Sequence, residues 1–260
     1  MPERTKERPS GCPKDIPTHV VGSLGLAEKL LKKGEDLRPH NAWMGVSTNQ
    51  KVYPDEMVVA FAKWASSRSN HFLVVIADGM QAYNEMAFGG KFGWADVDIR
   101  MEDYVEPALA RKEELRGLIE KEGLDNVSLD LWNDVVWNLR QKDDLLASHT
   151  KDLFNHQRQH NPDVETALIG IVEEKIPDVL NRARKRFGKI FVDFAAATYA
   201  EEEIHLTWLM AVLGDYPIKI GPPSELVYDK FVLDGMKGKF KFLEWKKASF
   251  GAVHLVHDSN

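Results

Sequence analysis

NAWMGVSTNQKVYPDEMVVAFAKWASSRSNHFLVVIAD, residues 41–78, decides the fold of this chain. AWMGVS predicts a short buried strand, and HFLVVIAD predicts a second strand that is apolar on both faces, as parallel strands are. PDEMVVAFAKWASSR between them predicts a helix, because Pro54 suits the first turn and apolar residues recur at helical spacing. A strand, a helix and a strand within about 35 residues form a βαβ unit.

The rest of the chain adds helices and a few extended pieces. Helical spacing predicts one or more helices in each of the ranges 104–123, 129–160, 161–188 and 189–213. Residues 216–223 and 225–232 are interpreted as short extended pieces, and 240–258 as a closing edge strand. We therefore predict a polar, flexible lead-in at 1–18 and one α/β domain at 19–260, a Rossmann-like parallel sheet flanked by helices.

Composition narrows the class of protein. The 260 residues are 43% hydrophobic and 28% charged, as in an ordinary globular protein with a sizeable core. The net charge of −6 gives no overall positive field to attract nucleic acid, so we expect no DNA partner and only a local basic surface. The single cysteine, Cys12, and the absence of an apolar leader or spanning segment favour a cytoplasmic protein that needs no membrane.

Ser47 is the first candidate catalytic residue. It directly follows a buried strand, and ligands of open α/β sheets bind at the carboxyl ends of the strands. The glycine-rich loops that bind dinucleotides or nucleoside triphosphates are absent, and so is the G-x-S-x-G turn of α/β hydrolases. The sequence also lacks the ATP-handling signatures of class I aminoacyl-tRNA synthetases. An acyl substrate would therefore arrive already activated.

Three segments resemble the cyclodipeptide synthases. The first is MGVSTNQKVYPDEMVVAFAKWA with FLVVIADGM, the second is TYAEEEIHLTW, and the third is PPSELVYDK. In order along the chain they supply Ser47, then Tyr199 and Glu203 four residues apart on one helical face, then Tyr228. The resemblance implies a fold similar to the catalytic core of tyrosyl- and tryptophanyl-tRNA synthetases. It also implies that two aminoacyl-tRNAs are joined into a cyclic dipeptide, without metal, ATP or another cofactor.

The resemblance assigns a role to each of these residues. Ser47 would attack the first aminoacyl ester and carry the aminoacyl group and then the dipeptidyl group as a covalent ester. Glu203 would hold and later deprotonate the substrate α-amino group. Tyr199 would hydrogen-bond that amino group, and Tyr228 would relay a proton during transfer or ring closure.

Seven further residues are assigned to the substrate pocket by the same resemblance. Gln50 and Asp229 occupy the two positions that distinguish the family's large branches, and they match neither branch. Asp229, together with the acidic run Glu201, Glu202 and Glu203, predicts an acidic site that favours a cationic amino acid, as in the arginine-using branch. The other five are Trp43, Gly45, Val75, Leu206 and Leu226.

A basic cluster is the candidate tRNA contact. The helix over 104–123, where the family commonly has its basic helix, is nearly neutral here. Five cations within NRARKRFGK could instead bind phosphates without reading bases. They are Arg182, Arg184, Lys185, Arg186 and Lys189. We expect a monomer.

Each feature alone also has an ordinary structural explanation. Ser47 could be a turn residue, the acidic run a solvated helix face, and the basic cluster a solvated helix end. His156 and His160 have the spacing of metal ligands, but no third ligand is placed with them. Two other functions remain open. One is a hydrolase or acyltransferase that uses Ser47 with His205, and the other is a synthetase-like tRNA-binding module without catalytic activity.

Overall fold

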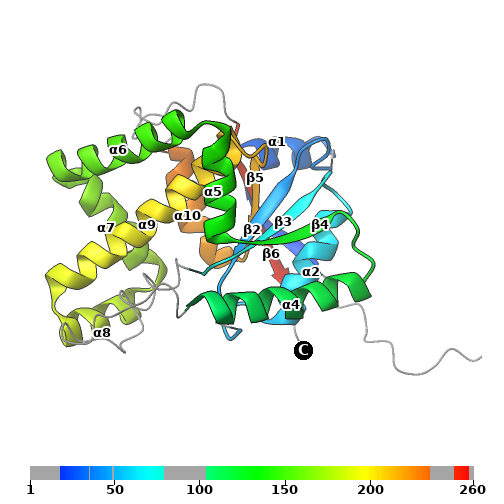
Figure 1. The fold of residues 1–260 in the computed structure, drawn as a ribbon, viewed down its shortest axis with the longest axis horizontal. Helices are drawn as coiled ribbons and strands as arrows, with labels where there is room; N and C mark the ends of the chain where they lie inside the picture. The colour runs from blue at the N-terminus through cyan, green and yellow to red at the C-terminus, as the bar shows by residue number, and fades with distance from the viewer. Residues whose placement is uncertain (1–17, 35, 49, 79–103, 235–248, 258–260) are drawn as a thin grey trace, which may run out of the picture.

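A computed structural model of the chain describes residues 18–34, 36–48, 50–78, 104–234 and 249–257. These residues form a six-stranded sheet in the order β1-β6-β5-β2-β3-β4, drawn in Figure 1. Neighbouring strands are parallel except at one side, where β1 runs antiparallel to β6. The strands are β1 (Thr18–Leu24), β2 (Ala42–Val46), β3 (Phe72–Ile76), β4 (Val127–Leu131), β5 (Ile218–Gly221) and β6 (Gly251–His257).

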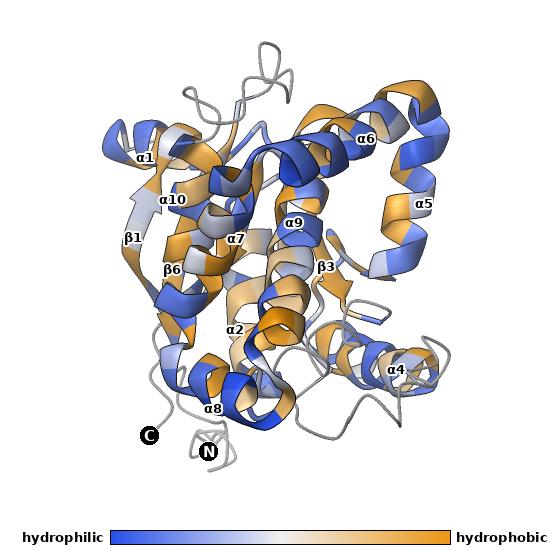
Figure 2. Cartoon of the chain, turned by 90° about the vertical axis from the view of Figure 1, so that its left-hand side faces the viewer, coloured by the Kyte–Doolittle hydropathy of each residue, from blue (hydrophilic) through white to orange (hydrophobic). Residues whose placement is uncertain are grey.

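Helices cover both faces of the sheet. The first group packs around the face that includes Met44 and Val74, and comprises α1 (Gly25–Lys32), α2 (Asp55–Ser66) and α4 (Val105–Lys121). The second group packs on the face that includes Trp43 and Val75, and forms the left half of Figure 1. It comprises α5 (Trp132–Lys142), α6 (Asp144–His160), α7 (Pro162–Lys175), α8 (Pro177–Phe187), α9 (Lys189–Val212) and α10 (Leu226–Asp234). Figure 2 shows mainly hydrophilic residues on α8.

The predicted βαβ unit is confirmed as β2, α2 and β3. Successive side chains of a strand point to opposite faces of the sheet, so the five residues of β2 contribute to two hydrophobic cores. Trp43 faces the core beneath the second helix group, whereas Met44 and Val46 face the core beneath the first group. The prediction of a mostly parallel α/β sheet is therefore correct.

Four local predictions are wrong. Residues 129–131, predicted to be helical, belong to β4, whose pattern VSLDL alternates apolar and polar residues directly before α5. Residues 226–234 form α10, although 225–232 were predicted to be extended. The last strand, β6, is internal because β1 pairs along its other side, and β1 was not predicted. Thr18, assigned to the lead-in, begins β1, while residues 1–17, including Cys12, lie outside the described residues.

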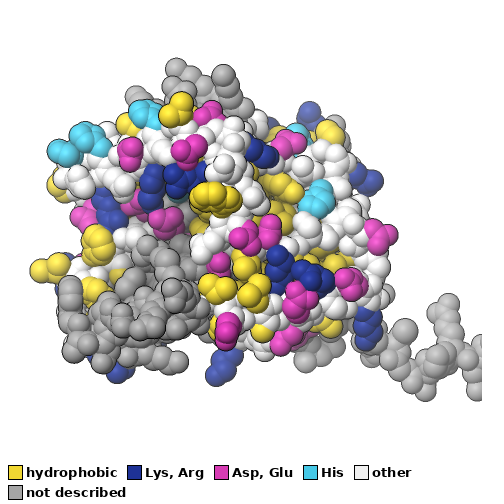
Figure 3. All heavy atoms as spheres, viewed as in Figure 1, with side chains coloured by type: hydrophobic (Ala, Val, Ile, Leu, Met, Phe, Trp, Pro, Cys, Tyr) yellow, Lys and Arg dark blue, Asp and Glu magenta, His cyan; other side chains and the backbone are white. Residues whose placement is uncertain are grey.

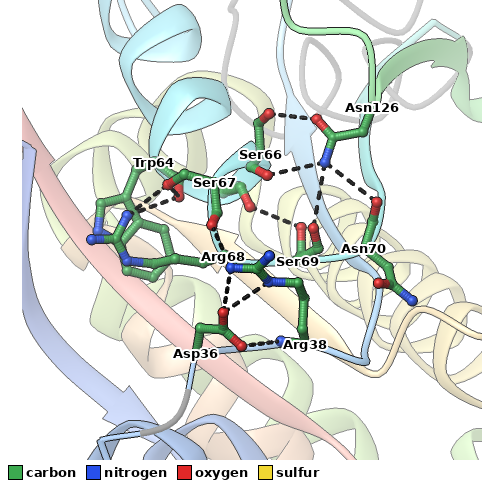
Figure 4. Close-up of polar contacts among 10 residues, drawn as sticks. Asp36, Arg38, Trp64, Ser66, Ser67, Arg68, Ser69, Asn70 and Asn126 are labelled. Carbon is green, nitrogen blue, oxygen red and sulfur yellow. Dashed lines mark hydrogen bonds and ion pairs between the residues drawn. The ribbon is translucent and has the colours of Figure 1, made fainter.

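Hydrogen bonds hold the amino ends of the strands together, as Figure 4 shows. The Asn126 side chain, just before β4, contacts the Ser66 hydroxyl and donates to the carbonyls of Ser66 at 3.0 Å, Asn70 at 3.3 Å and Ser69 at 3.4 Å. Arg38, before β2, donates to Asp36 and to the Ser67 carbonyl. This edge lies opposite the strand ends where Ser47 is found.

Candidate active site

The candidate site lies where the strand order reverses. The chain runs from β2 to β3 and β4 in one direction and then returns to β5 on the other side of β2. Strands β2 and β5 pair in parallel through Ala42 with Ile218 and Trp43 with Lys219, so both strands run toward the same edge of the sheet. Half-buried Ser47 follows β2 there, and the segment to α10 follows β5. Such a reversal point is the usual ligand crevice of an open α/β sheet.

Helices α9 and α10 bring Tyr199 and Tyr228 together. Their rings meet edge to face, with centroids 6.0 Å apart and an interplanar angle of 88°. Burial is the main factor that raises the pKa of both phenols. Tyr228 raises the pKa of Tyr199 further, and Glu203 raises the pKa of both tyrosines further. Both tyrosines therefore stay neutral at physiological pH and can donate a hydrogen bond.

Glu203 joins a buried group of charges, named here the charge cluster, that consists of Lys175, Glu203, Lys219, Glu225 and Asp229. The Lys219 ammonium nitrogen lies 3.8 Å from a Glu203 carboxylate oxygen, 3.4 Å from Glu225 and 3.3 Å from Asp229. Lys175 lies 2.6 Å from Glu225 on the other side. One strand, three helices and a short turn thus meet in one set of ion pairs, with Tyr53 and His254 at its border.

Tyr53 and His254 complete the surroundings of the charge cluster. The Tyr53 hydroxyl donates to Glu225 at 3.1 Å, and Tyr53 lies on the segment that joins Ser47 to α2. His254 on β6 lies 2.9 Å from Asp229 through its Nε2 atom. Burial, followed by the charge of Glu225, raises the pKa of Tyr53. The cluster therefore connects the Ser47 segment to the helices that carry Glu203 and Tyr228.

The carboxyl groups of the charge cluster ionise differently. Burial opposes ionisation of Glu225, but Lys175 and Lys219 outweigh it and lower its pKa to about 2. At Glu203 burial dominates and raises the pKa, although Lys219 acts against it. Burial also disfavours the charged form of Lys219, yet its carboxylate neighbours raise its pKa and keep it an ammonium ion. Of Glu203 and Glu225, Glu203 is therefore the carboxyl group that is protonated more easily.

The expectation that three consecutive glutamates crowd the site is wrong. Glu201 lies 2.7 Å from Lys151 and 3.1 Å from Arg158, both on α6. Glu202 also pairs with Lys151. Consecutive helical residues point about 100° apart, so Glu201 and Glu202 meet α6 while Glu203 meets Lys219.

The pocket residues inferred by resemblance lie in different surroundings. Trp43 and Val75 are buried in the core on the α9 face of the sheet, Leu206 belongs to the same core, and Gly45 is paired with Val75. The Trp43 indole nitrogen has no hydrogen-bond partner, and the Lys219 ammonium lies 5.7 Å from its ring. Leu226, in contrast, is 41% exposed. Gln50 is exposed and donates to Glu114 of α4 at 3.0 Å.

Sequence reasoning missed five residues around Glu203: Tyr53, Lys175, Lys219, Glu225 and His254. One signal was present, because Lys219 interrupts the short apolar strand IKIG, all of whose residues are buried. A lysine in a buried strand needs anionic partners. The other four carried no local signal.

The basic cluster divides into two parts. Arg182, Lys185, Arg186 and Lys189 are exposed at the end of α8 and the start of α9. Arg184 is half-buried and lies 2.9 Å from Glu173 and 2.6 Å from Asp193, so its charge is already paired. Basic and acidic side chains are interspersed over the face drawn in Figure 3.

The histidines outside the site form different contacts. Burial lowers the pKa of His205 to about 3, with Lys151 adding to the effect, so this imidazole is a weak base. His156 and His160 stack with ring centroids 4.2 Å apart, and the His160 ring bonds to the His156 carbonyl. In the part of the chain that the structure describes, no three His, Cys, Asp or Glu side chains are arranged so that they could hold a metal ion. None of the described helices has the length and apolar character to cross a membrane.

Solved structures share this fold. The chain matches a cyclodipeptide synthase from Fluoribacter dumoffii with a TM-score of 0.58 and 12% identity, over 85% of this chain and 91% of that one. It matches one from Bacillus thermoamylovorans with a TM-score of 0.56 and 12% identity, over 92% and 96%. A tyrosyl-tRNA synthetase from Archaeoglobus fulgidus matches with a TM-score of 0.52 and 12% identity, over 87% of this chain and 56% of that one. No protein-family model and no curated protein sequence matches. The predicted Rossmann-like, synthetase-like fold is thus confirmed.

Proposed function

We propose that this chain is a tRNA-dependent cyclodipeptide synthase that uses Ser47 as its nucleophile. The observation that carries the proposal is the position of Ser47 at the strand-order reversal of a cyclodipeptide-synthase fold. Tyr199, Glu203 and Tyr228 supply the matching second half of the set, with the two tyrosines in ring contact. The resemblance of three sequence segments and the ring contact of the two tyrosines together support this assignment.

The proposed reaction has three acyl transfers. The Ser47 hydroxyl attacks the ester carbonyl of the first aminoacyl-tRNA, and the departing 3′-oxygen of the tRNA takes the proton. The α-amine of the bound aminoacyl group then attacks the ester carbonyl of the second aminoacyl-tRNA. The 3′-oxygen of that tRNA leaves with the proton lost by the amine, and a dipeptide remains on Ser47. The free amine of that dipeptide attacks the Ser47 ester, closes the ring and returns the proton to the serine oxygen.

Glu203 and the two tyrosines handle the amine. An ionised Glu203 binds the α-ammonium group and accepts its proton before each attack by the amine. Neutral Tyr199 and Tyr228 keep their protons because their pKa values are raised, so they can donate hydrogen bonds and relay a proton. His205 is a poor alternative base for Ser47, since its pKa is about 3. This disfavours the hydrolase alternative.

The substrate is proposed to include a cationic amino acid such as arginine. The charge cluster holds three carboxylates, Glu203, Glu225 and Asp229, and two lysines, Lys175 and Lys219. These three carboxylates and two lysines together have a net charge of −1, which a cationic group can balance. The substrate α-ammonium would provide one such group, and a cationic substrate side chain another.

Transfer RNA is proposed to contact the exposed cations of α8 and α9. Arg182, Lys185, Arg186 and Lys189 are accessible for phosphates, whereas Arg184 is held by two carboxylates. Such contacts weaken as salt concentration rises because counterions compete for the phosphates. We further propose that the enzyme acts as a cytoplasmic monomer.

Mass spectrometry of culture medium tests the proposal. Cells that express the wild type should release a new cyclic dipeptide, and its mass identifies the amino acids. Ser47→Ala should abolish it, whereas Ser148→Ala, which removes a hydroxyl that contacts Arg140 on α5, should not. Intact-protein mass spectrometry should also detect an aminoacyl adduct on Ser47 that does not form when RNase destroys the aminoacyl-tRNA beforehand. A cyclic dipeptide made by Ser47→Ala would falsify the nucleophile, and none from the wild type would refute the synthase.

A further inference from the structure

Lys219 is a buried cation at the centre of the candidate site. Its side chain is 4% exposed, and it lies on β5 between β2 and β6. Removing an ammonium group from water costs several kcal/mol unless anions compensate for it. Here carboxylates from α9, the turn after β5 and α10 all lie within 4 Å of its nitrogen.

We propose that Lys219 is a positioning residue whose ammonium group keeps Glu203 ionised and oriented toward the substrate amine. Its catalytic consequence rests on the function proposed above. Among the described residues, Lys219 is the cation in ion-pair contact with Glu203. Lys175, the other lysine of the cluster, pairs with Glu225 instead.

The surroundings of Glu203 explain why this one contact matters. Glu225 and Asp229 face Glu203 as negative charges, Lys175 acts as a more distant positive charge, and Tyr199 and Tyr228 are neutral neighbours. Tyr53 and His254 face the cluster through Glu225 and Asp229. Burial and the two carboxylates favour the protonated form of Glu203, and Lys219 is the strongest opposing influence.

Loss of Lys219 would therefore affect Glu203 first. Glu225 would keep Lys175 at 2.6 Å and Tyr53 at 3.1 Å, and Asp229 would keep His254 at 2.9 Å. Glu203 would keep no described ion-pair partner, so a proton would settle on its carboxyl group. A protonated Glu203 neither binds an ammonium ion strongly nor accepts its proton.

Lys219 itself does not act as a base or nucleophile. Its carboxylate neighbours raise its pKa beyond the effect of burial, so it carries no free electron pair at physiological pH. Its role is electrostatic, through Glu203. A purely structural lysine would support the fold without changing the titration of that carboxyl group.

NMR of the full chain labelled with carboxyl-¹³C glutamate measures this titration directly. The Glu203 signal is assigned by its loss in Glu203→Gln. In Lys219→Met we expect the Glu203 midpoint to rise by at least about one pH unit, since a neighbouring opposite charge shifts a pKa by about 1–3 units. Lys112→Met is the matched control, because Lys112 is also largely buried and pairs with Asp130 at 3.0 Å, outside the charge cluster. It should leave the midpoint unchanged.

A second variant covers the case in which Lys219→Met does not fold. Lys219→Met/Asp229→Asn removes one positive and one negative charge, so the cluster keeps its net charge. The Glu203 midpoint should still rise, by less, because Asp229 is the weakest of the charged influences on Glu203 and Lys219 the strongest. An unchanged midpoint in either folded variant overturns the proposal, and so does failure of the double variant to fold.

The reaction provides an independent readout. If the synthase function holds, the acidic limb of the rate profile should move to higher pH in Lys219→Met and stay in place in Lys112→Met. If no cyclic dipeptide forms even with the wild type, the proposed function fails while the NMR shift still decides the role of Lys219. If the wild type is active but the NMR midpoint stays, only the Lys219 proposal fails.

Discussion

Replacing Arg111 by methionine tests how the segment after Ser47 is held in place. Arg111 lies on α4 with a side chain that is 2% exposed. Its guanidinium contacts Asp55 and donates to the Tyr53 carbonyl at 2.7 Å. Tyr53 in turn donates to Glu225, so this contact connects α4 to the charge cluster. Arginine and methionine have similar helix propensities, and the substitution therefore isolates these contacts.

The expected loss of stability follows from three contributions. The charged hydrogen bond to the Tyr53 carbonyl contributes about 1.5–3 kcal/mol. The pair with Asp55, whose side chain is 34% exposed, adds about 0.5 kcal/mol after solvent screening. The Arg111 Nε atom is buried without a partner, so its removal recovers about 1 kcal/mol. The net decrease in the free energy of unfolding is about 1–2.5 kcal/mol.

Urea unfolding followed by circular dichroism measures this decrease. Arg116→Met is the matched control on the same helix, since Arg116 pairs with Glu113 at the surface. It should change the free energy of unfolding by less than about 0.5 kcal/mol, as exposed ion pairs do. Equal effects of the two substitutions would refute the reasoning. Under the proposed function, Arg111→Met should also slow adduct formation on Ser47 in the folded protein.

Two further predictions concern stability. Gly251→Ala should destabilise the chain by about 1–3 kcal/mol, because its new methyl group would lie 2.3 Å from the Ala27 nitrogen. Gly170→Ala, where α7 has open space, should instead stabilise the chain by about 0.5–1 kcal/mol. Thermal unfolding that finds a change of the same sign for both variants would contradict this. The pKa of His205 is lowered to about 3 in the folded state, so between that value and about 6.5 the unfolded chain binds the extra proton and stability falls as pH falls. From pH 7 to pH 5 the wild type should lose about 2 kcal/mol more than His205→Leu, and equal losses in urea unfolding at the two pH values would show that His205 is not responsible.

The sequence predicted the parts of the fold whose patterns are local. Residues 41–78 hold a complete βαβ unit, with an apolar strand on each side of a helix that begins after Pro54. Strand β4 was missed because only three apolar residues alternate in it before α5 begins. The position of β6 inside the sheet depends on β1, which lies more than 200 residues away in the chain. No local pattern reports such a pairing.

The same distinction applies to the candidate site. Tyr199 and Glu203 could be paired from sequence because they lie four residues apart on one helix. Lys175, Lys219 and Glu225 meet only after α7, β5 and the turn that follows β5 have packed together. Their ion pairs therefore became visible only in the structure, although a lysine within IKIG indicated that partners were needed.

The charge of the site also depends on packing, and this alters the argument for a cationic substrate. The run Glu201, Glu202, Glu203 counts as three negative charges in the sequence, but only Glu203 joins the charge cluster. Lysines balance two of the three carboxylate charges of that cluster. Burial raises the pKa of Glu203, whereas the two lysines lower that of Glu225 against the effect of burial. A bound ammonium group would stabilise the ionised form of Glu203 in the same way as Lys219 does. Under the proposed function, substrate binding and ionisation of Glu203 are therefore coupled, and the amine that Glu203 is proposed to deprotonate also stabilises its basic form.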